Sequence, residues 1–103
     1  MGKFTNATIK KEANIYYDGS VTSRSIVLED GSEVSLGIML PGEYTFNTNK
    51  AEIMEMLSGN LEVKLPDEEW KTLNTPESFN VASNSSFEVR VKTVTDYCCR
   101  YID

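Results

Sequence analysis

Apolar residues alternate with polar ones through much of this chain, and this period of two restricts the possible folds more than any other feature. The clearest segments are 34–40, 61–65 and 87–91, in which every second residue is Val, Ile, Leu or Phe. Successive side chains of a strand point to opposite faces, so each segment predicts a strand with one buried face. Residues 97–102 are apolar or aromatic at most positions and predict a more fully buried strand.

Turn-forming residues separate these segments at intervals that suit short strands. Gly and Asn accept a positive φ, and Pro fixes φ near the value that a turn needs. About nine short strands result, which is typical of a sandwich or a barrel. Residues 50–57 have high helix propensity, but they lead into a turn and another clear strand, so we predict a strand there too. The turn signals are Asp18-Gly19, Asp30-Gly31, Pro41-Gly42, Ser58-Gly59-Asn60, Pro66-Asp67, Thr75-Pro76 and Ser83-Asn84-Ser85.

The composition indicates one folded domain and argues against two classes of function. A chain of 103 residues, 40% of them hydrophobic, predicts a β-barrel domain over residues 14–103 behind a polar N-terminal arm, residues 1–13. The net charge of −6 argues against a nucleic-acid-binding protein, which usually has a basic surface. No apolar run reaches the roughly 18 residues of a membrane span, and the N-terminus lacks the apolar core of a signal peptide. We therefore expect no membrane partner and a cytoplasmic location.

Metal ligands are scarce in this sequence. The chain has no histidine, a favoured ligand of zinc, copper and iron and the commonest acid–base group at neutral pH. Its two cysteines, Cys98 and Cys99, are adjacent, so on a strand they would point to opposite faces. We therefore expect no metal site, and we interpret both cysteines as reduced structural thiols.

Two segments resemble the motifs of the cupin fold. Glu52 and Gly59 have the spacing of the glutamate and the glycine in the first cupin motif. Residues 76–87 resemble the second motif, which runs from a turn through a short apolar strand to a loop. The metal-binding histidines of both motifs are missing, and the resemblance implies an all-β, cupin-type (jelly-roll) barrel without the usual metal. The residues near the place of the first histidine pair are Thr45, Asn47 and Thr48.

Further segments resemble one family of short bacterial cupins. They are residues 36–48, with the sequence LGIMLPGEYTFNT, and residues 51–59, 62–66 and 97–102. Their combination, which covers nearly the whole chain from residue 13, is similar to the pyrimidine/purine nucleoside phosphorylase family. Ala82 departs from the family pattern, which has a Pro there, and this concerns a turn more than the chemistry.

The resemblance implies an enzyme that catalyses phosphorolysis. Inorganic phosphate, a co-substrate, attacks the anomeric carbon of a purine or pyrimidine nucleoside and releases the free base and pentose 1-phosphate. The expected partners are nucleosides and phosphate, and no metal or organic cofactor is implied. A non-catalytic cupin that binds a small sugar or nucleotide is the alternative. Because small cupins have exposed sheet edges, we also expect a homodimer.

Two residues are predicted to be catalytic. The transition state has oxocarbenium character, so the site must hold phosphate near the anomeric carbon and stabilise the charge that moves onto the base. Glu52 is the predicted carboxylate, because the motif directs it into the barrel, where burial would raise its pKa. Arg100 is the predicted phosphate ligand, because a guanidinium suits an anion, although an internal salt bridge is an alternative role.

Four further residues are predicted to bind substrate. Arg24 follows two hydroxyl-bearing residues that could also meet an anion, and Tyr97 could stack on a base. Glu43 and Tyr44 belong to the segment that resembles the family. The simpler interpretations are a surface charge for Glu43 and a place in the core for Tyr44 and Tyr97.

Overall fold

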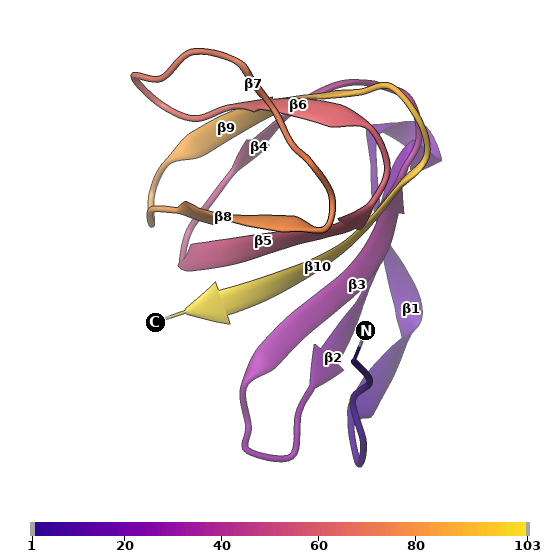
Figure 1. Cartoon of the computed structure of the whole chain (residues 1–103). Coiled ribbons are helices and arrows are strands. Elements are labelled where there is room, and N and C mark those ends of the chain that lie inside the picture. Colours follow the sequence, from indigo (N-terminus) through magenta and orange to yellow (C-terminus); the bar gives the residue numbers. More distant parts are fainter. Residues whose placement is uncertain (1, 103) are drawn as a thin grey trace.

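Two antiparallel β-sheets face each other in this protein (Figure 1). The computed structural model describes residues 2–102. The larger sheet has the strand order β1-β2-β3-β10-β5-β8, and the smaller has the order β4-β9-β6-β7. None of the helical segments among the described residues has the length and apolar character that crossing a membrane requires. The elements are β1 (Thr8–Tyr16), the 3-10 turn η1 (Tyr17–Gly19), β2 (Val21–Val27), β3 (Glu33–Met39), β4 (Gly42–Asn47), β5 (Ala51–Ser58), β6 (Leu61–Lys64), β7 (Lys71–Thr72), β8 (Glu77–Val81), β9 (Ser86–Val91) and β10 (Thr95–Ile102).

From β3 onward, nearly every connection carries the chain from one sheet to the other. Strands β3, β5, β8 and β10 belong to the larger sheet, while β4, β6, β7 and β9 belong to the smaller one. This alternation is the jelly-roll arrangement, so the prediction of an all-β, cupin-type fold is confirmed. Within residues 2–102 the two sheets do not close into one continuous hydrogen-bonded barrel. Residues 51–58 form strand β5 in spite of their helix propensity, as predicted.

The core lies between the two sheets, and in β6 and β9 it contains the apolar residues that the alternation selects. For residues 34–40 the predicted buried face was wrong, because Met39 belongs to this core while Ile38 and Leu40 are exposed. In β9, for example, Phe87, Val89 and Val91 are buried, while Glu88 between them is exposed. Met56 of β5 is fully buried against this layer from the opposite sheet. Full burial of such a side chain stabilises the fold by about 1.5–3 kcal/mol.

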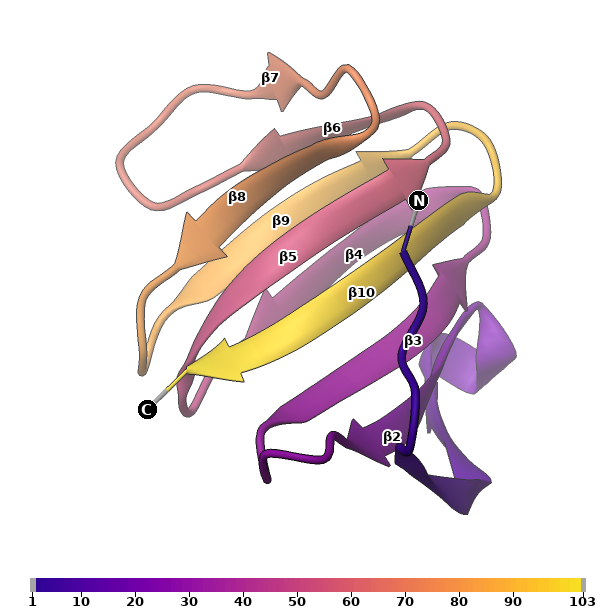
Figure 2. The same cartoon turned by 60° about the horizontal axis from the view of Figure 1, so that its bottom comes forward.

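A second apolar cluster lies on the outer face of the larger sheet, under the N-terminal segment. Ile26, Val34 and Cys98 are buried there, and Phe4 packs against them. In Figure 2 the indigo N-terminal segment crosses this face of the sheet. The predicted arm is therefore not separate from the domain: β1 begins at Thr8 and pairs with β2, so residues 8–13 belong to the sheet.

The open edge of the larger sheet supports the proposal of a homodimer. Among the described strands, β1 pairs with β2 alone, and it carries the exposed side chains of Ile9 and Ile15. An unpaired edge with exposed apolar residues is commonly covered by a second copy of the chain. Light scattering at micromolar concentration should give twice the chain mass of 11.6 kDa. A mass equal to that of one chain would contradict the proposal.

Candidate functional site

A cavity of about 430 Å³ opens between the two sheets. This volume is in the range of sites that bind small molecules, roughly 300–1,000 Å³. Strands β2, β3, β10 and β5 of the larger sheet form one wall, and β4, β9 and residues 47–50 form the other. The cavity therefore lies inside the fold, between the two sheets.

The buried part of the cavity combines apolar side chains with hydroxyl groups. Tyr97 lies across Gly37 of the neighbouring strand, where a Cβ atom would come within 2.8 Å of the ring. The missing side chain at Gly37 thus makes room for this ring. Tyr97 donates a hydrogen bond from its Oη to the Thr22 carbonyl at 3.3 Å, and burial raises its pKa well above the ordinary value of 10.0. The other buried lining residues are Ser23, Ser35, Met39, Thr48, Met54, Phe87 and Cys99.

Glu52 points into this cavity beside Cys99 of the adjacent strand. The Cys99 thiol donates a hydrogen bond to Oε2 of Glu52 at 3.1 Å. Burial raises the pKa of the Glu52 carboxyl, and the hydrogen bond from the thiol only partly opposes this effect. The carboxyl group therefore keeps its proton to a higher pH than an exposed glutamate, and it can donate that proton to a bound molecule.

Two neutral donors surround this carboxyl group. Burial and the nearby Glu52 carboxylate raise the pKa of Cys99 far above 9.0, so the thiol stays protonated and is a donor rather than a nucleophile. Burial raises the pKa of Tyr101 to about 12, and its Oη lies 3.3 Å from Oγ of Ser35. Electrostatic and hydrogen-bonding contacts link Tyr101 to Cys99. The site thus offers a connected set of uncharged polar groups.

The exposed lining residues at the mouth of the cavity include charged and amide side chains. Lys50, Glu33, Asn47 and Asn49 are exposed there. Lys50 is the one cationic side chain among the lining residues in the described part of the chain. The mouth is thus the part of the site best suited to bind an anion.

The two predicted catalytic residues lie on different faces of the larger sheet. Glu52 lines the cavity, whereas Arg100 lies between the inward-facing Cys99 and Tyr101 on β10 and so points to the outer face. The guanidinium of Arg100 is 5.7 Å from the centroid of the Phe4 ring. Their predicted roles stay predictions, but the structure does not bring the two side chains together.

Of the predicted substrate-binding residues, Tyr97 lines the cavity and Arg24 does not. Arg24 is exposed on β2 and donates a hydrogen bond from its guanidinium to the Lys11 carbonyl at 3.0 Å. Tyr44 is buried, and its Oη donates a hydrogen bond to the Leu40 carbonyl at 2.6 Å. Tyr44 is therefore a core residue, which was the simpler interpretation of its sequence position. Tyr97 is buried as well, but it also lines the cavity.

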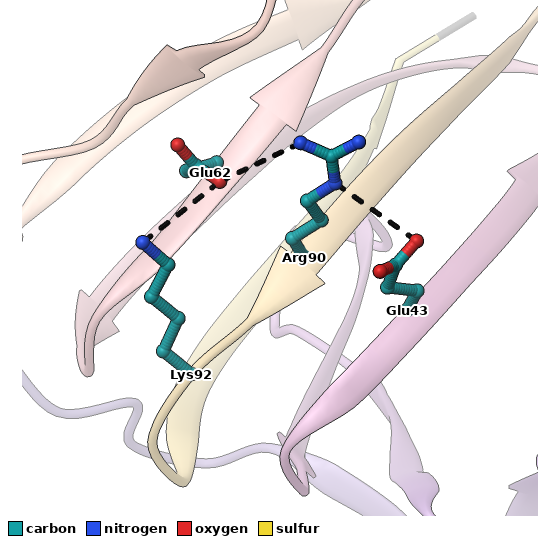
Figure 3. A network of polar contacts seen from close by, with 4 residues as sticks. All are labelled: Glu43, Glu62, Arg90 and Lys92. Carbon is teal, nitrogen blue, oxygen red and sulfur yellow. Dashed lines mark ion pairs between the residues drawn. The ribbon is translucent and has the colours of Figure 1, made fainter.

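Glu43 belongs to a network of charges on the outer face of the smaller sheet (Figure 3). Its Oε1 lies 3.9 Å from Nε of Arg90, and Nη1 of Arg90 lies 3.9 Å from Oε1 of Glu62. Nζ of Lys92 is 4.0 Å from the same Glu62 oxygen, and the Arg90 guanidinium lies over the Trp70 ring. This exposed network contributes little stability, and it places Glu43 away from the cavity.

Sequence reasoning missed Cys99, Tyr101 and Lys50 as lining residues. The signal for the first two was present, because residues 97, 99 and 101 must share one face of a strand, opposite to Arg100. Lys50 directly precedes β5 and is two residues before Glu52. Because Lys50 lies in the bend before the strand, no alternation in the sequence indicates that its side chain faces the cavity.

The predicted absence of a metal site stays a prediction. Within residues 2–102, no three His, Cys, Asp or Glu side chains are close enough together to hold a metal ion. The thiol of Cys98 lies in the outer apolar cluster, on the opposite face from Cys99. The adjacent cysteines are thus separated by the sheet, as the alternation predicts.

Comparison with known proteins identifies the family. The model of the family described as pyrimidine/purine nucleoside phosphorylase matches residues 11–101. The chain is 65% identical over 102 residues to the protein of that name from Sulfurimonas denitrificans, with 99% of each chain covered. The corresponding protein of Hydrogenovibrio crunogenus is 57% identical over 104 residues, with 100% of each covered. A crystal structure of a protein of unknown function from Acinetobacter sp. ADP1 matches with a TM-score of 0.93 and 35% identity, over 97% of this chain and 98% of that one. The chain belongs to the pyrimidine/purine nucleoside phosphorylase family.

Proposed function

We propose that this protein catalyses the phosphorolysis of purine and pyrimidine nucleosides. A phosphate oxygen forms a bond to the anomeric carbon while the bond from that carbon to the base nitrogen breaks, and the electron pair of the broken bond goes to the base. The products are the free base and pentose 1-phosphate. The relatives named for this activity support the proposal, and the position of Glu52 inside the cavity is the structural observation that carries it.

The role of Glu52 in this reaction is to donate a proton to the departing base. Negative charge develops on the base as the bond breaks, so a nearby acid lowers the energy of the transition state. Glu52 suits this role because its burial favours the protonated carboxyl, and the Cys99 thiol hydrogen bond fixes its Oε2. Positioned acids of this kind contribute about 10²- to 10⁴-fold to the rate.

The apolar lining supports a broad choice of base. Phe46 and Phe87 from one sheet and Met39 and Met54 from the other line the cavity. Aromatic rings bind the flat faces of both purines and pyrimidines, and flexible methionines adapt to bases of different size. A site of this chemistry recognises a base by its shape and aromatic faces more than by a fixed pattern of hydrogen bonds.

A direct assay tests the proposal. The purified protein is incubated with uridine, cytidine, adenosine or guanosine, with and without inorganic phosphate, and free base is measured by chromatography. Base release that depends on phosphate, with pentose 1-phosphate as the second product, is the expected result. Release in water alone would indicate a hydrolase. Nucleoside binding without any release would favour the non-catalytic cupin.

A further inference from the structure

We propose that Lys50 binds the phosphate co-substrate at the mouth of the cavity, with the side-chain amides of Asn47 and Asn49 as additional donors. The inference rests on the proposed function, because it assigns a position to the co-substrate of that reaction. In this inference Lys50 takes the role of phosphate ligand that the sequence analysis predicted for Arg100. The anion then binds at the entrance of the cavity rather than in its buried part.

The distribution of positive charge leads to this position. A phosphate ion requires cationic or N–H donors. The three arginines lie elsewhere: Arg24 and Arg100 are on the outer face of the larger sheet, and Arg90 interacts with glutamates and Trp70 on the smaller one. Among the described residues that line the cavity, the cation is Lys50. The cavity therefore offers phosphate one strong electrostatic partner.

The carboxyl groups of the cavity are compatible with an anion at this place. Two of them line the site, those of Glu33 and Glu52. Glu52 is partly buried further inside the cavity, and burial raises the pKa of its carboxyl. Glu33 is exposed, so water screens its repulsion of the phosphate. Lys50 also interacts within the protein, and its three N–H donors allow it to bind an anion in addition.

The segment that carries these donors is held in place by Thr48. This residue is buried, and its Oγ1 donates a hydrogen bond to the Ala82 carbonyl at 2.7 Å and accepts one from the Ser85 amide at 2.9 Å. The Thr48 amide also donates to the Ser85 carbonyl at 2.9 Å, and the Asn84 amide donates to the Asn49 carbonyl at 3.2 Å. Because the loop between β4 and β5 is tied to the loop between β8 and β9, little conformational entropy is lost when its donors bind an anion.

The positions of Lys50 and Glu52 fit the reaction. Lys50 lies in the bend that directly precedes β5, and Glu52 is the second residue of that strand. Both line the same cavity, Lys50 at its mouth and Glu52 further inside. A phosphate beside Lys50 and a base beside Glu52 would therefore lie on either side of one anomeric carbon, which is the arrangement that displacement of the base by phosphate requires.

The test measures phosphate binding separately from turnover. Lys50→Met and Lys50→Arg are compared with Lys92→Met, which removes a lysine from the outer network of Figure 3. Inorganic phosphate is titrated into each protein and followed by phosphorus NMR, and KM is determined for phosphate and for uridine. Melting temperatures check that all variants fold.

We expect Lys50→Met to raise both Kd and KM for phosphate about tenfold to a hundredfold, the loss of one charge-assisted hydrogen bond. The KM for uridine should change by less than about threefold, since the nucleoside contacts remain. Lys50→Arg should retain part of the phosphate affinity, and Lys92→Met all of it. Unchanged phosphate binding by Lys50→Met would overturn the inference. If the wild-type protein is active in the same assays, the proposed function stands. Wild-type protein that binds phosphate through Lys50 but releases no base would overturn the proposed function alone.

Discussion

Glu52→Gln should lower kcat/KM for phosphorolysis by about 10²- to 10⁴-fold, because the amide fills the same space but cannot give a proton to the departing base. The side chain lies within the cavity and accepts a hydrogen bond from the Cys99 thiol at 3.1 Å. A glutamine oxygen can accept the same bond, so the geometry of the cavity should persist. The measurement is kcat/KM with uridine and phosphate, together with the melting temperature of each protein.

The melting temperature distinguishes a catalytic role of Glu52 from a structural one. The pKa of Glu52 is raised above its ordinary value of 4.5 in the folded state. The stability that comes from protonation of this group is therefore complete below the ordinary pKa and is lost as the pH rises through the folded-state pKa. Glutamine is uncharged throughout, so at neutral pH the variant should be at least as stable as the wild type. A parallel fall in activity and melting temperature would instead show that Glu52 is structural.

Arg100→Lys is the matched comparison for this experiment. Arg100 lies on the outer face of the sheet near Phe4, so its replacement should change kcat/KM by no more than about twofold. A loss as large as that of Glu52→Gln would show that Arg100 acts on the substrate, as the sequence resemblance predicted. The two substitutions thus decide whether Arg100 acts on the substrate, as predicted from the sequence, or lies outside the site, as its position in the structure indicates.

The fold was predictable because its main determinant is local. Alternation in β6 and β9 reflects one buried and one more exposed face, and this pattern is visible in any strand of a two-layer protein. In β3 the alternation predicted the strand but not its inward face: Ser35 and Met39 line the cavity, whereas Ile38 is exposed. For β5 the neighbouring turn and strand outweighed helix propensity. The inward position of Glu52 was predicted on different grounds, from the resemblance of Glu52 and Gly59 to the first cupin motif.

Alternation places Arg100 on the opposite face of β10 from Tyr97, Cys99 and Tyr101, but it did not show which face is the interior, because both faces of β10 are covered over part of its length. Cys99 faces the cavity, while Cys98 on the opposite face is buried under the N-terminal segment around Phe4. A strand buried on both sides has no polar face to show which side is the interior. The sequence from 97 to 102 therefore indicated burial correctly for its first half, but did not reveal which residues share a face with Glu52.

The donors at the mouth were hidden from sequence reasoning for a different reason. The conformation of residues 47–50 depends on the hydrogen bonds of Thr48 to Ala82 and Ser85. Those partners are 34 and 37 residues away along the chain. The alternation of apolar residues does not indicate a contact between residues so far apart in the sequence. The role of this loop in shaping the cavity is therefore visible only in the tertiary structure.

Gly37→Ala should destabilise the protein by about 2–4 kcal/mol and distort the wall of the cavity. A Cβ atom at this position would overlap the Thr22 carbonyl oxygen of the neighbouring strand and approach Cζ and Oη of Tyr97 to 2.8 Å. The first clash is with backbone, so no side-chain rotation can relieve it. Strand β2 or β3 must move, and the hydrogen bond from Tyr97 to Thr22 is disturbed with it. Urea denaturation gives the change in the free energy of unfolding, and kcat/KM is measured in parallel.

Gly2→Ala is the control for this substitution, because a Cβ atom there has no neighbour within 4 Å. It should change the free energy of unfolding by less than about 0.5 kcal/mol. Gly37→Ala should lower stability and activity together, in contrast to Glu52→Gln, which should lower activity alone. The difference follows from position: Gly37 fixes the distance between strands in the wall of the cavity, while Glu52 adds a reactive group to a wall already formed. A Gly37→Ala protein as stable as Gly2→Ala would show that the Thr22 carbonyl and the Tyr97 ring do not lie against Gly37.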